Sequence, residues 1–248
     1  MREKVVVITG ASSGIGAALA ENLGRRGAAL ALIARRREIL AEVAGRSGDR
    51  AVAVICDVTR REDVRRAVAE VIERFGRIDV WVNNAGRGIS RTPSELTDDD
   101  IHDMMRVNVL SVLYGMQEVL PHFQSRNEGH IINISSMLGR IPFATVRSAY
   151  CGAKHFVNAL TATFRAEVAA THPGIQVSLV SPGVVYTDFG LNALHGGPDS
   201  RQFEGGQSAE EVAEVIAGVI ESRRADVYTR AGSRERVLGY FGSLGEDA

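Results

Sequence analysis

Tyr150 and Lys154 are the two residues whose types and spacing best suit proton-transfer chemistry. Residues four apart in a helix lie on one face, so a phenol and an ammonium at this spacing become neighbours. A nearby cation favours the phenolate and lowers the pKa of a tyrosine from its usual value of about 10. A tyrosine tuned in this way can protonate a carbonyl oxygen while hydride arrives at carbon, or accept a proton from an alcohol in reverse.

Ser136 adds a hydroxyl that could hydrogen-bond the same substrate oxygen. It follows a predicted strand, at the edge where open α/β sheets bind their ligands. Taken singly, a Tyr–Lys pair is more often an exposed helix contact, and a serine at this position is more often a strand-end cap. Hydrolysis by a serine nucleophile fits less well, because the chain has no Gly-x-Ser-x-Gly turn and its six histidines form no motif.

A glycine loop, Gly10-Ala-Ser-Ser-Gly14-Ile-Gly16, separates a predicted strand from a predicted helix. The first glycine permits a tight turn, the second lets a pyrophosphate approach the backbone, and the third lets the helix pack closely on the sheet. The start of the helix offers free amides and a positive dipole end to phosphate. This order of strand, loop and helix predicts dinucleotide binding.

The end of the second predicted strand indicates which dinucleotide is bound. An acidic residue there would bind the ribose 2′-hydroxyl and repel a 2′-phosphate, but this chain has Ala34 followed by Arg35, Arg36 and Arg37. One good Arg35 contact to phosphate would contribute about 1.5–3 kcal/mol, or roughly ten- to a hundredfold in favour of NADPH. We therefore expect NADP(H) as the cofactor.

Short β-branched segments alternate with amphipathic segments along most of the chain. Strands are predicted at 4–9, 28–34, 51–56, 78–83, 130–135, 176–181 and 226–229. Helices are predicted near 14–26, 36–44, 60–75, 100–124, 150–171 and 208–222, with capping boxes at Thr59–Glu62 and Ser208–Glu211. The alternation predicts an α/β fold in which one domain, 1–248, forms a Rossmann-type, doubly wound parallel sheet of about seven strands flanked by helices. A long Gly-rich stretch indicates a substrate lid at about 188–207.

The composition excludes several other classes of protein. The chain has a net charge of −1 and is 45% hydrophobic, as expected of a soluble globular domain without attraction to nucleic acid or anionic membranes. Its longest apolar run, 28–34, is far too short to span a bilayer. Cys56 and Cys151 stand apart and form no metal or disulfide pattern. We expect a cytoplasmic protein with no metal, no nucleic-acid partner and no membrane partner.

Several segments resemble one family in the correct order along nearly the whole chain. They are TGASSGIG at 9–16, NNAG at 83–86, SSMLG at 135–139, YCGAK at 150–154 and SPGVVYT at 181–187. Together they resemble the motifs of the short-chain dehydrogenases/reductases. Gly152 replaces the alanine common in the family's YxASK motif, which lowers local helix stability by about 1 kcal/mol.

The resemblance implies roles for individual residues. The implied catalytic residues are Asn108, Ser136, Tyr150 and Lys154, with Asn108 positioning a water that relays the proton and Lys154 also holding the nicotinamide ribose. The implied cofactor site, in which Asp57 contacts the adenine, comprises Gly10, Ser12, Ser13, Gly14, Ile15, Gly16, Arg35, Arg36, Asp57, Val58, Asn84, Ala85, Gly86, Tyr150, Lys154, Pro182, Gly183, Val185 and Thr187.

The substrate is a small carbonyl or alcohol compound whose identity stays open. A 3-oxoacyl thioester reductase and a small-ketone or steroid-like alcohol dehydrogenase both fit, and a non-catalytic dinucleotide-sensing protein is a remote alternative that the intact Ser136, Tyr150 and Lys154 disfavour. An apolar pocket could be lined by Phe189, Leu191, Leu194, Met137, Leu138, Ile141 and Phe143. Four loop arginines are either ordinary surface or partners for an acidic group, namely Arg87, Arg91, Arg140 and Arg147.

The resemblance also implies a homo-oligomer, a homotetramer or homodimer that pairs the two long predicted helices. Both helices offer apolar residues beyond what one sheet needs, although these could instead belong to the core. They are Leu113, Met116, Leu120, Phe156, Leu160 and Phe164.

Overall fold

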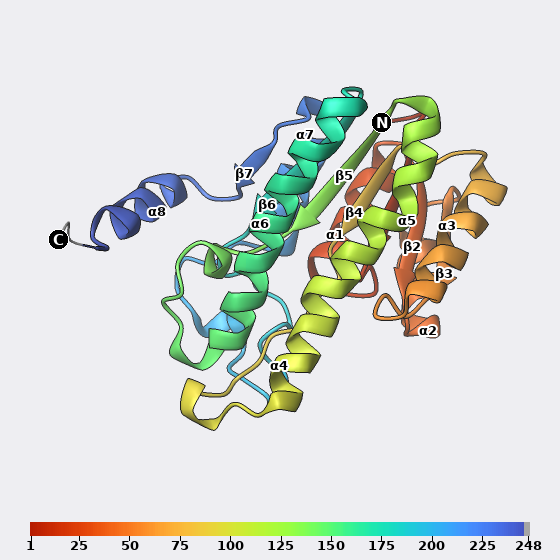
Figure 1. The fold of residues 1–248 in the computed structure, drawn as a ribbon. Coiled ribbons are helices and arrows are strands. Elements are labelled where there is room, and N and C mark those ends of the chain that lie inside the picture. Colours follow the sequence, from red (N-terminus) through yellow and green to blue (C-terminus); the bar gives the residue numbers. More distant parts are fainter. Residues whose placement is uncertain (246–248) are drawn as a thin grey trace.

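A computed structural model describes residues 1–245 and contains one seven-stranded, all-parallel sheet (Figure 1). The strand order is β3-β2-β1-β4-β5-β6-β7, which confirms the predicted fold. The strands are β1 (Val5–Thr9), β2 (Ala29–Ala34), β3 (Ala51–Ile55), β4 (Val80–Asn83), β5 (Gly129–Ile134), β6 (Ile175–Ser181) and β7 (Asp226–Tyr228). The order reverses between β1 and β4, and at such a switch point the loops diverge and leave room for a ligand.

Helices cover both faces of the sheet. They are α1 (Gly14–Arg25), α2 (Arg37–Arg46), α3 (Arg61–Phe75), α4 (Asp98–Met105), α5 (Ser111–Arg126), α6 (Ser148–Thr171), α7 (Ala209–Ser222) and α8 (Ser233–Gly242). Side chains alternate along each strand, so Val6 and Ile8 pack with α1, α2 and α7, whereas Val5 and Val7 pack with α3, α5 and α6. Helix α8 was not predicted, and it extends away from the body of the molecule (Figure 1).

One of the two predicted capping boxes is wrong. Ser208 and Glu211 do cap α7 reciprocally. Thr59 does not cap α3, because its backbone amide and its hydroxyl both donate to Asp57 Oδ1, at 3.0 and 2.8 Å. Because of this local turn after β3, the N-cap residue of α3 is Arg60. A box that the sequence reading missed, Thr97 with Asp100, begins α4.

The single helix predicted at 100–124 is two helices joined by a π-helical turn at Arg106–Leu110. Asn108 lies inside this turn and is fully buried. Its Nδ2 donates to the Met104 and Arg87 carbonyls, at 3.2 and 2.9 Å, and its Oδ1 accepts from the Arg87 amide. A π-turn widens the helix by one residue, and such turns are frequent at functional sites.

Part of the apolar surface expected to pair subunits belongs to the core instead. Met116 and Phe164 are buried against the sheet, and Leu113, Leu120 and Leu160 are partly buried beside them. Phe156 is 50% exposed. The oligomeric state therefore stays a prediction. No helix in residues 1–245 combines the length and apolar character that a bilayer span requires.

Candidate active site

The glycine loop connects β1 to α1 and is tightly folded. Gly10 and Gly14 have φ values of +67° and +56°, which residues other than glycine rarely adopt. A Cβ on Gly16 would lie 2.6 Å from both the Gly10 carbonyl oxygen and Asn84 Nδ2. These glycine positions therefore have no room for a side chain, and the loop begins a helix whose free amides suit a pyrophosphate.

The segment after β4 is fastened to this loop. The amides of Asn84 and Ala85 both donate to Thr9 Oγ1, at 3.0 and 3.1 Å, and Asn84 Nδ2 donates to the Thr9 carbonyl. A Cβ on Gly86 would lie 3.0 Å from Asn108 Oδ1 and 3.7 Å from Lys154 Nζ. The NNAG segment thus connects the cofactor side of the site with the catalytic candidates.

Two further groups lie at the predicted adenosine end of the site. Asp57 is partly buried, which opposes its ionisation, but hydrogen bonds from Thr59 and the charge of Arg35 outweigh this and lower its pKa. Arg36 Nη2 donates to Ser12 Oγ and Ser13 Oγ, both at 2.9 Å, and Arg35 is exposed. A guanidinium therefore already lies on the rim of the glycine loop, although it is that of Arg36 and not that of Arg35.

Tyr150 and Lys154 lie on the first turns of α6, both buried. Lys154 Nζ is 5.7 Å from the centroid of the Tyr150 ring, so the predicted shared helix face is confirmed. Nζ donates to the Ile134 carbonyl at the end of β5, at 2.9 Å. This bond aims the ammonium at the carboxyl edge of the sheet.

The expected lowering of the Tyr150 pKa is not what the structure gives. Burial raises the pKa of Tyr150 to about 12, against the smaller opposing effects of a Ser136 hydrogen bond and the Arg147 charge. Burial also lowers the pKa of Lys154 to about 8. The spacing of the two residues indicates the charge of Lys154 near Tyr150, but it does not indicate the loss of water around both groups, which disfavours each charged form.

Ser136 follows β5 and faces the same space. It is 8% exposed, and its Oγ accepts from the Leu138 amide at 3.1 Å. It lies near enough to Tyr150 to oppose the rise in the pKa of the phenol. The site thus brings together Ser136, Tyr150 and Lys154, while Asn108 is linked to them through Gly86.

The segment after β6 completes the site. The Pro182 carbonyl accepts from the Met137 amide at 2.7 Å, and Val185 bridges to Gln207. A Cβ on Gly14 would lie 3.3 Å from Thr187 Cγ2, so the residue just before the predicted lid lies against the glycine loop. The remaining cofactor candidates are Ile15 at the start of α1, Val58 after β3 and Gly183 after β6. All three are partly buried.

Only part of the predicted apolar lining surrounds Tyr150. Phe189 packs edge-on against the Tyr150 ring, with 5.6 Å between centroids, and Leu138 and Leu194 pack in the same cluster. Met137 and Ile141 instead pack with Val237 of α8. Phe143 and Leu191 are each 50% exposed.

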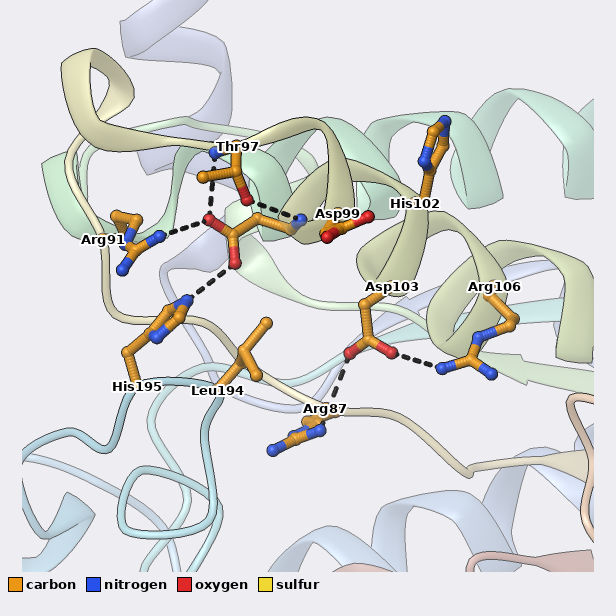
Figure 2. Close-up of a pocket in the computed structure, with 10 residues that line it drawn as sticks. Arg87, Arg91, Thr97, Asp99, His102, Asp103, Arg106, Leu194 and His195 are labelled. Carbon is orange, nitrogen blue, oxygen red and sulfur yellow. Dashed lines mark hydrogen bonds and ion pairs between the residues drawn. The ribbon is translucent and has the colours of Figure 1, made fainter.

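Beside the lid, a cavity of about 610 Å³ contains charged groups that are already paired (Figure 2). Asp100 accepts from His195 Nε2 at 2.7 Å and from Arg91 Nη1 at 2.9 Å. The hydrogen bond from His195 leads the effects that hold the pKa of Asp100 well below its ordinary value. The sequence does not predict this link from the lid to α4, because no local motif indicates a contact between residues so distant in the chain.

The arrangement of sheet, glycine loop and buried Tyr–Lys pair defines a dinucleotide-binding oxidoreductase fold, and comparisons with known proteins agree. The family model for short chain dehydrogenase matches residues 4–195. An uncharacterized oxidoreductase of Staphylococcus saprophyticus is 39% identical over 189 residues, which are 76% of each chain. The mouse dehydrogenase/reductase SDR family member 7B is 33% identical over 242 residues, 92% of this chain and 73% of that protein.

Solved structures extend the likeness to the whole fold. A short-chain dehydrogenase from Sphingobium yanoikuyae in complex with NADPH has a TM-score of 0.83 and 28% identity, over 99% of this chain and 97% of that one. One from Burkholderia phymatum in complex with NAD has a TM-score of 0.88 and 26% identity, with the same shares covered. The chain belongs to the short-chain dehydrogenase/reductase family and is an oxidoreductase that uses a nicotinamide dinucleotide. No group of side chains in residues 1–245 is arranged to hold a metal ion.

Proposed function

We propose that this enzyme transfers hydride between NADP(H) and a carbonyl or secondary alcohol substrate, with Tyr150 as the acid and base. The observation that carries the proposal is the convergence of Ser136, Tyr150 and Lys154 beside a glycine loop that has no room for side chains. When bound, the nicotinamide supplies or accepts the hydride. The protein's own groups then handle the proton and the oxygen.

In the reducing direction, Ser136 Oγ and the Tyr150 hydroxyl hold the carbonyl oxygen, and Tyr150 gives its proton to that oxygen as the alkoxide forms. A Tyr150 pKa of about 12 keeps this proton in place at neutral pH. The Lys154 ammonium lies 5.7 Å from the ring centroid and stabilises the phenolate that remains. Asn108 is proposed to position the water that restores the proton, since its side chain fastens the backbone between the NNAG segment and α4.

The preference for NADPH is supported by Arg36 and Arg35. The three residues directly after β2 are arginines and not carboxylates, and Arg36 already hydrogen-bonds the two serines of the glycine loop. A 2′-phosphate at this rim would meet a guanidinium and not a repelling acid. The lid at 188–207 is proposed to close over the substrate, because its residue Phe189 packs on Tyr150, while Thr187 just before the lid abuts Gly14.

A panel of ketones, aldehydes and 3-oxoacyl thioesters, followed by loss of NADPH absorbance, tests this function. We expect turnover with at least one class of carbonyl compound and a higher kcat/KM for NADPH than for NADH. Binding of both dinucleotides without turnover of any compound, in both directions, would instead favour a dinucleotide-sensing role.

A further inference from the structure

Three of the four loop arginines around the site are neutralised by carboxylates. The pairs are Arg87 with Asp103 at 3.6 Å, Arg91 with Asp100 at 2.9 Å and Arg140 with Asp226 at 2.5 Å. Arg147, the fourth, has no carboxylate partner within residues 1–245. Of the four arginines, Arg147 is therefore the one whose charge no carboxylate of the described residues neutralises.

The Arg147 guanidinium lies between the segment after β4 and the lid. Its Nη1 donates to the Ile89 carbonyl at 2.9 Å. A Cβ on Gly88 would lie 2.5 Å from this nitrogen and 3.0 Å from Cε1 of Phe189, whose ring packs on Tyr150. Arg147 is therefore beside the aromatic residue that covers the proposed acid and base.

A buried hydroxyl lies close to the guanidinium without being bonded to it. A Cβ on Gly197 would lie 3.1 Å from Arg147 Nη2 and 2.7 Å from Ser90 Oγ, so the Gly197 backbone packs tightly against both groups. Ser90 Oγ has no hydrogen-bond partner in the described part of the chain. Within that part, the guanidinium therefore bonds only the Ile89 carbonyl, and its other donors are free for a ligand atom that accepts hydrogen bonds.

Electrostatics favour an anion as that ligand. Burial lowers the pKa of Arg147, and its charge reaches Tyr150 strongly enough to oppose the raised pKa of the phenol. A cation removed from water without a counter-charge is costly, and an anionic ligand group would relieve that cost. Guanidinium pairs with carboxylate through two parallel hydrogen bonds, which also fixes the ligand's orientation.

We propose that Arg147 binds a carboxylate of the substrate, so that the enzyme acts on oxo acids and the corresponding hydroxy acids in preference to neutral carbonyl compounds. This inference rests on the proposed function, because it takes the carbonyl to be held at Tyr150 and Ser136. Arg147 flanks the start of α6, and both its guanidinium and the Tyr150 ring lie beside the Phe189 ring. We therefore expect the carboxylate and the carbonyl of the substrate to be separated by only a few carbon atoms.

The test compares 2-, 3- and 4-oxo carboxylic acids with their methyl esters in wild type, Arg147→Met, Arg147→Lys and Ser90→Ala. Wild type is expected to prefer one acid over its ester. Arg147→Met should lower kcat/KM for that acid by about ten- to a hundredfold and for the ester by less than threefold. Arg147→Lys should keep part of the preference, and Ser90→Ala should change it by less than threefold, because the Ser90 hydroxyl is not bonded to the guanidinium. Arg140→Met, which removes an arginine that is already paired, is the matched control and should leave the preference unchanged.

Two kinetic results would overturn the inference while the proposed function stands. One is a wild type that reduces esters at least as well as every acid. The other is an equal loss on acid and ester in Arg147→Met, with a shifted pH profile of kcat, which would mean that Arg147 acts through Tyr150.

Calorimetry on the NADP⁺-loaded protein separates this inference from the proposed function if no compound is turned over. Binding of an oxo acid to wild type that Arg147→Met abolishes would support the carboxylate site even without turnover. Absent binding, or binding that Arg147→Met leaves unchanged, would overturn it.

Discussion

The β1–β2–β3 half of the sheet differs from the β4–β5–β6 half in what its strands bury. Strands β1 and β2 read VVVIT and ALALIA, and almost every side chain is an apolar group packed on helices. In the other half, Trp81 Nε1 donates to Asn83 Oδ1, Asn83 Nδ2 to Asn133 Oδ1, and Asn133 Nδ2 to Thr161 Oγ1, at 2.7, 2.8 and 2.9 Å. Thr161 belongs to α6, the helix of Tyr150 and Lys154.

The difference corresponds to what each half contributes to the site. The first half offers backbone amides at the glycine loop, where no catalytic side chain has to be positioned, and apolar packing suffices to hold its strands. The second half must hold catalytic side chains on α6 in register with the end of β5. Hydrogen bonds fix direction in a way that apolar contacts do not, so a buried polar network suits that task.

The largest effect should come from the half that provides side chains. Tyr150→Phe removes the transferable proton and keeps the ring, so kcat should fall a hundredfold or more while the Kd for NADPH changes little. Stopped-flow turnover and fluorescence titration would measure the two quantities. Near-wild-type turnover would sink the proposed mechanism. Lys154→Ala should impair both quantities, and an effect on KM alone would refute the electrostatic role of Lys154.

The next effect tests the half that binds cofactor. Arg36→Ala should lower kcat/KM for NADPH by about ten- to a hundredfold and leave NADH nearly unchanged, because only NADPH has a 2′-phosphate. Arg35→Ala is the matched comparison and should cost less, since Arg35 makes no contact with the loop serines. A larger loss in Arg35→Ala than in Arg36→Ala would show that Arg35 binds the 2′-phosphate, as the sequence predicts. The NADPH effect should shrink as salt rises.

The polar half should also be the acid-sensitive half. Burial lowers the pKa of His130 on β5 from 6.5 to about 3. Between these values the unfolded chain binds a proton that the folded chain does not, so stability falls as pH drops through this window. At pH 5 the loss should be about 2 kcal/mol relative to pH 7, measured by urea unfolding. His130→Gln should remove most of this loss, and an unchanged slope would show that other groups cause it.

The smallest effect tests whether Gly16 is needed because the glycine loop has no room for a Cβ, and not because of a general effect of glycine in helices. Gly16→Ala should weaken NADPH binding by about tenfold, because its Cβ would lie 2.6 Å from the Gly10 carbonyl oxygen. Gly45→Ala in α2 is the control, since a Cβ there meets nothing within 4 Å. It should leave binding unchanged and stabilise the helix slightly. Equal binding in both variants would contradict the tight fit of the loop.

The elements that the sequence predicted are those with a local signal. Runs such as 28–34 and the Gly10–Gly16 loop are recognisable from neighbouring residues, and the family motifs gave the family and the fold. Helix α8 lacked such a signal. The turn at Thr59 and the π-turn around Asn108 depend on contacts made by Asp57 and Arg87.

What the sequence could not give is the environment of each charge. Tyr150 and Lys154 were found from spacing, but the direction of the Tyr150 pKa depends on how much water the fold removes. The four loop arginines looked alike in sequence. Only their folded positions distinguish Arg147 from the three that meet carboxylates.

Thr187 and Phe189 are two residues apart, yet one abuts the glycine loop and the other covers Tyr150. A single short segment therefore lies against both parts of the proposed site. We expect bound dinucleotide to fix this segment and so to shape the space for the substrate, which predicts that the dinucleotide binds first and leaves last. Product inhibition should accordingly be competitive between the two forms of the dinucleotide, with the alcohol product departing before either can exchange.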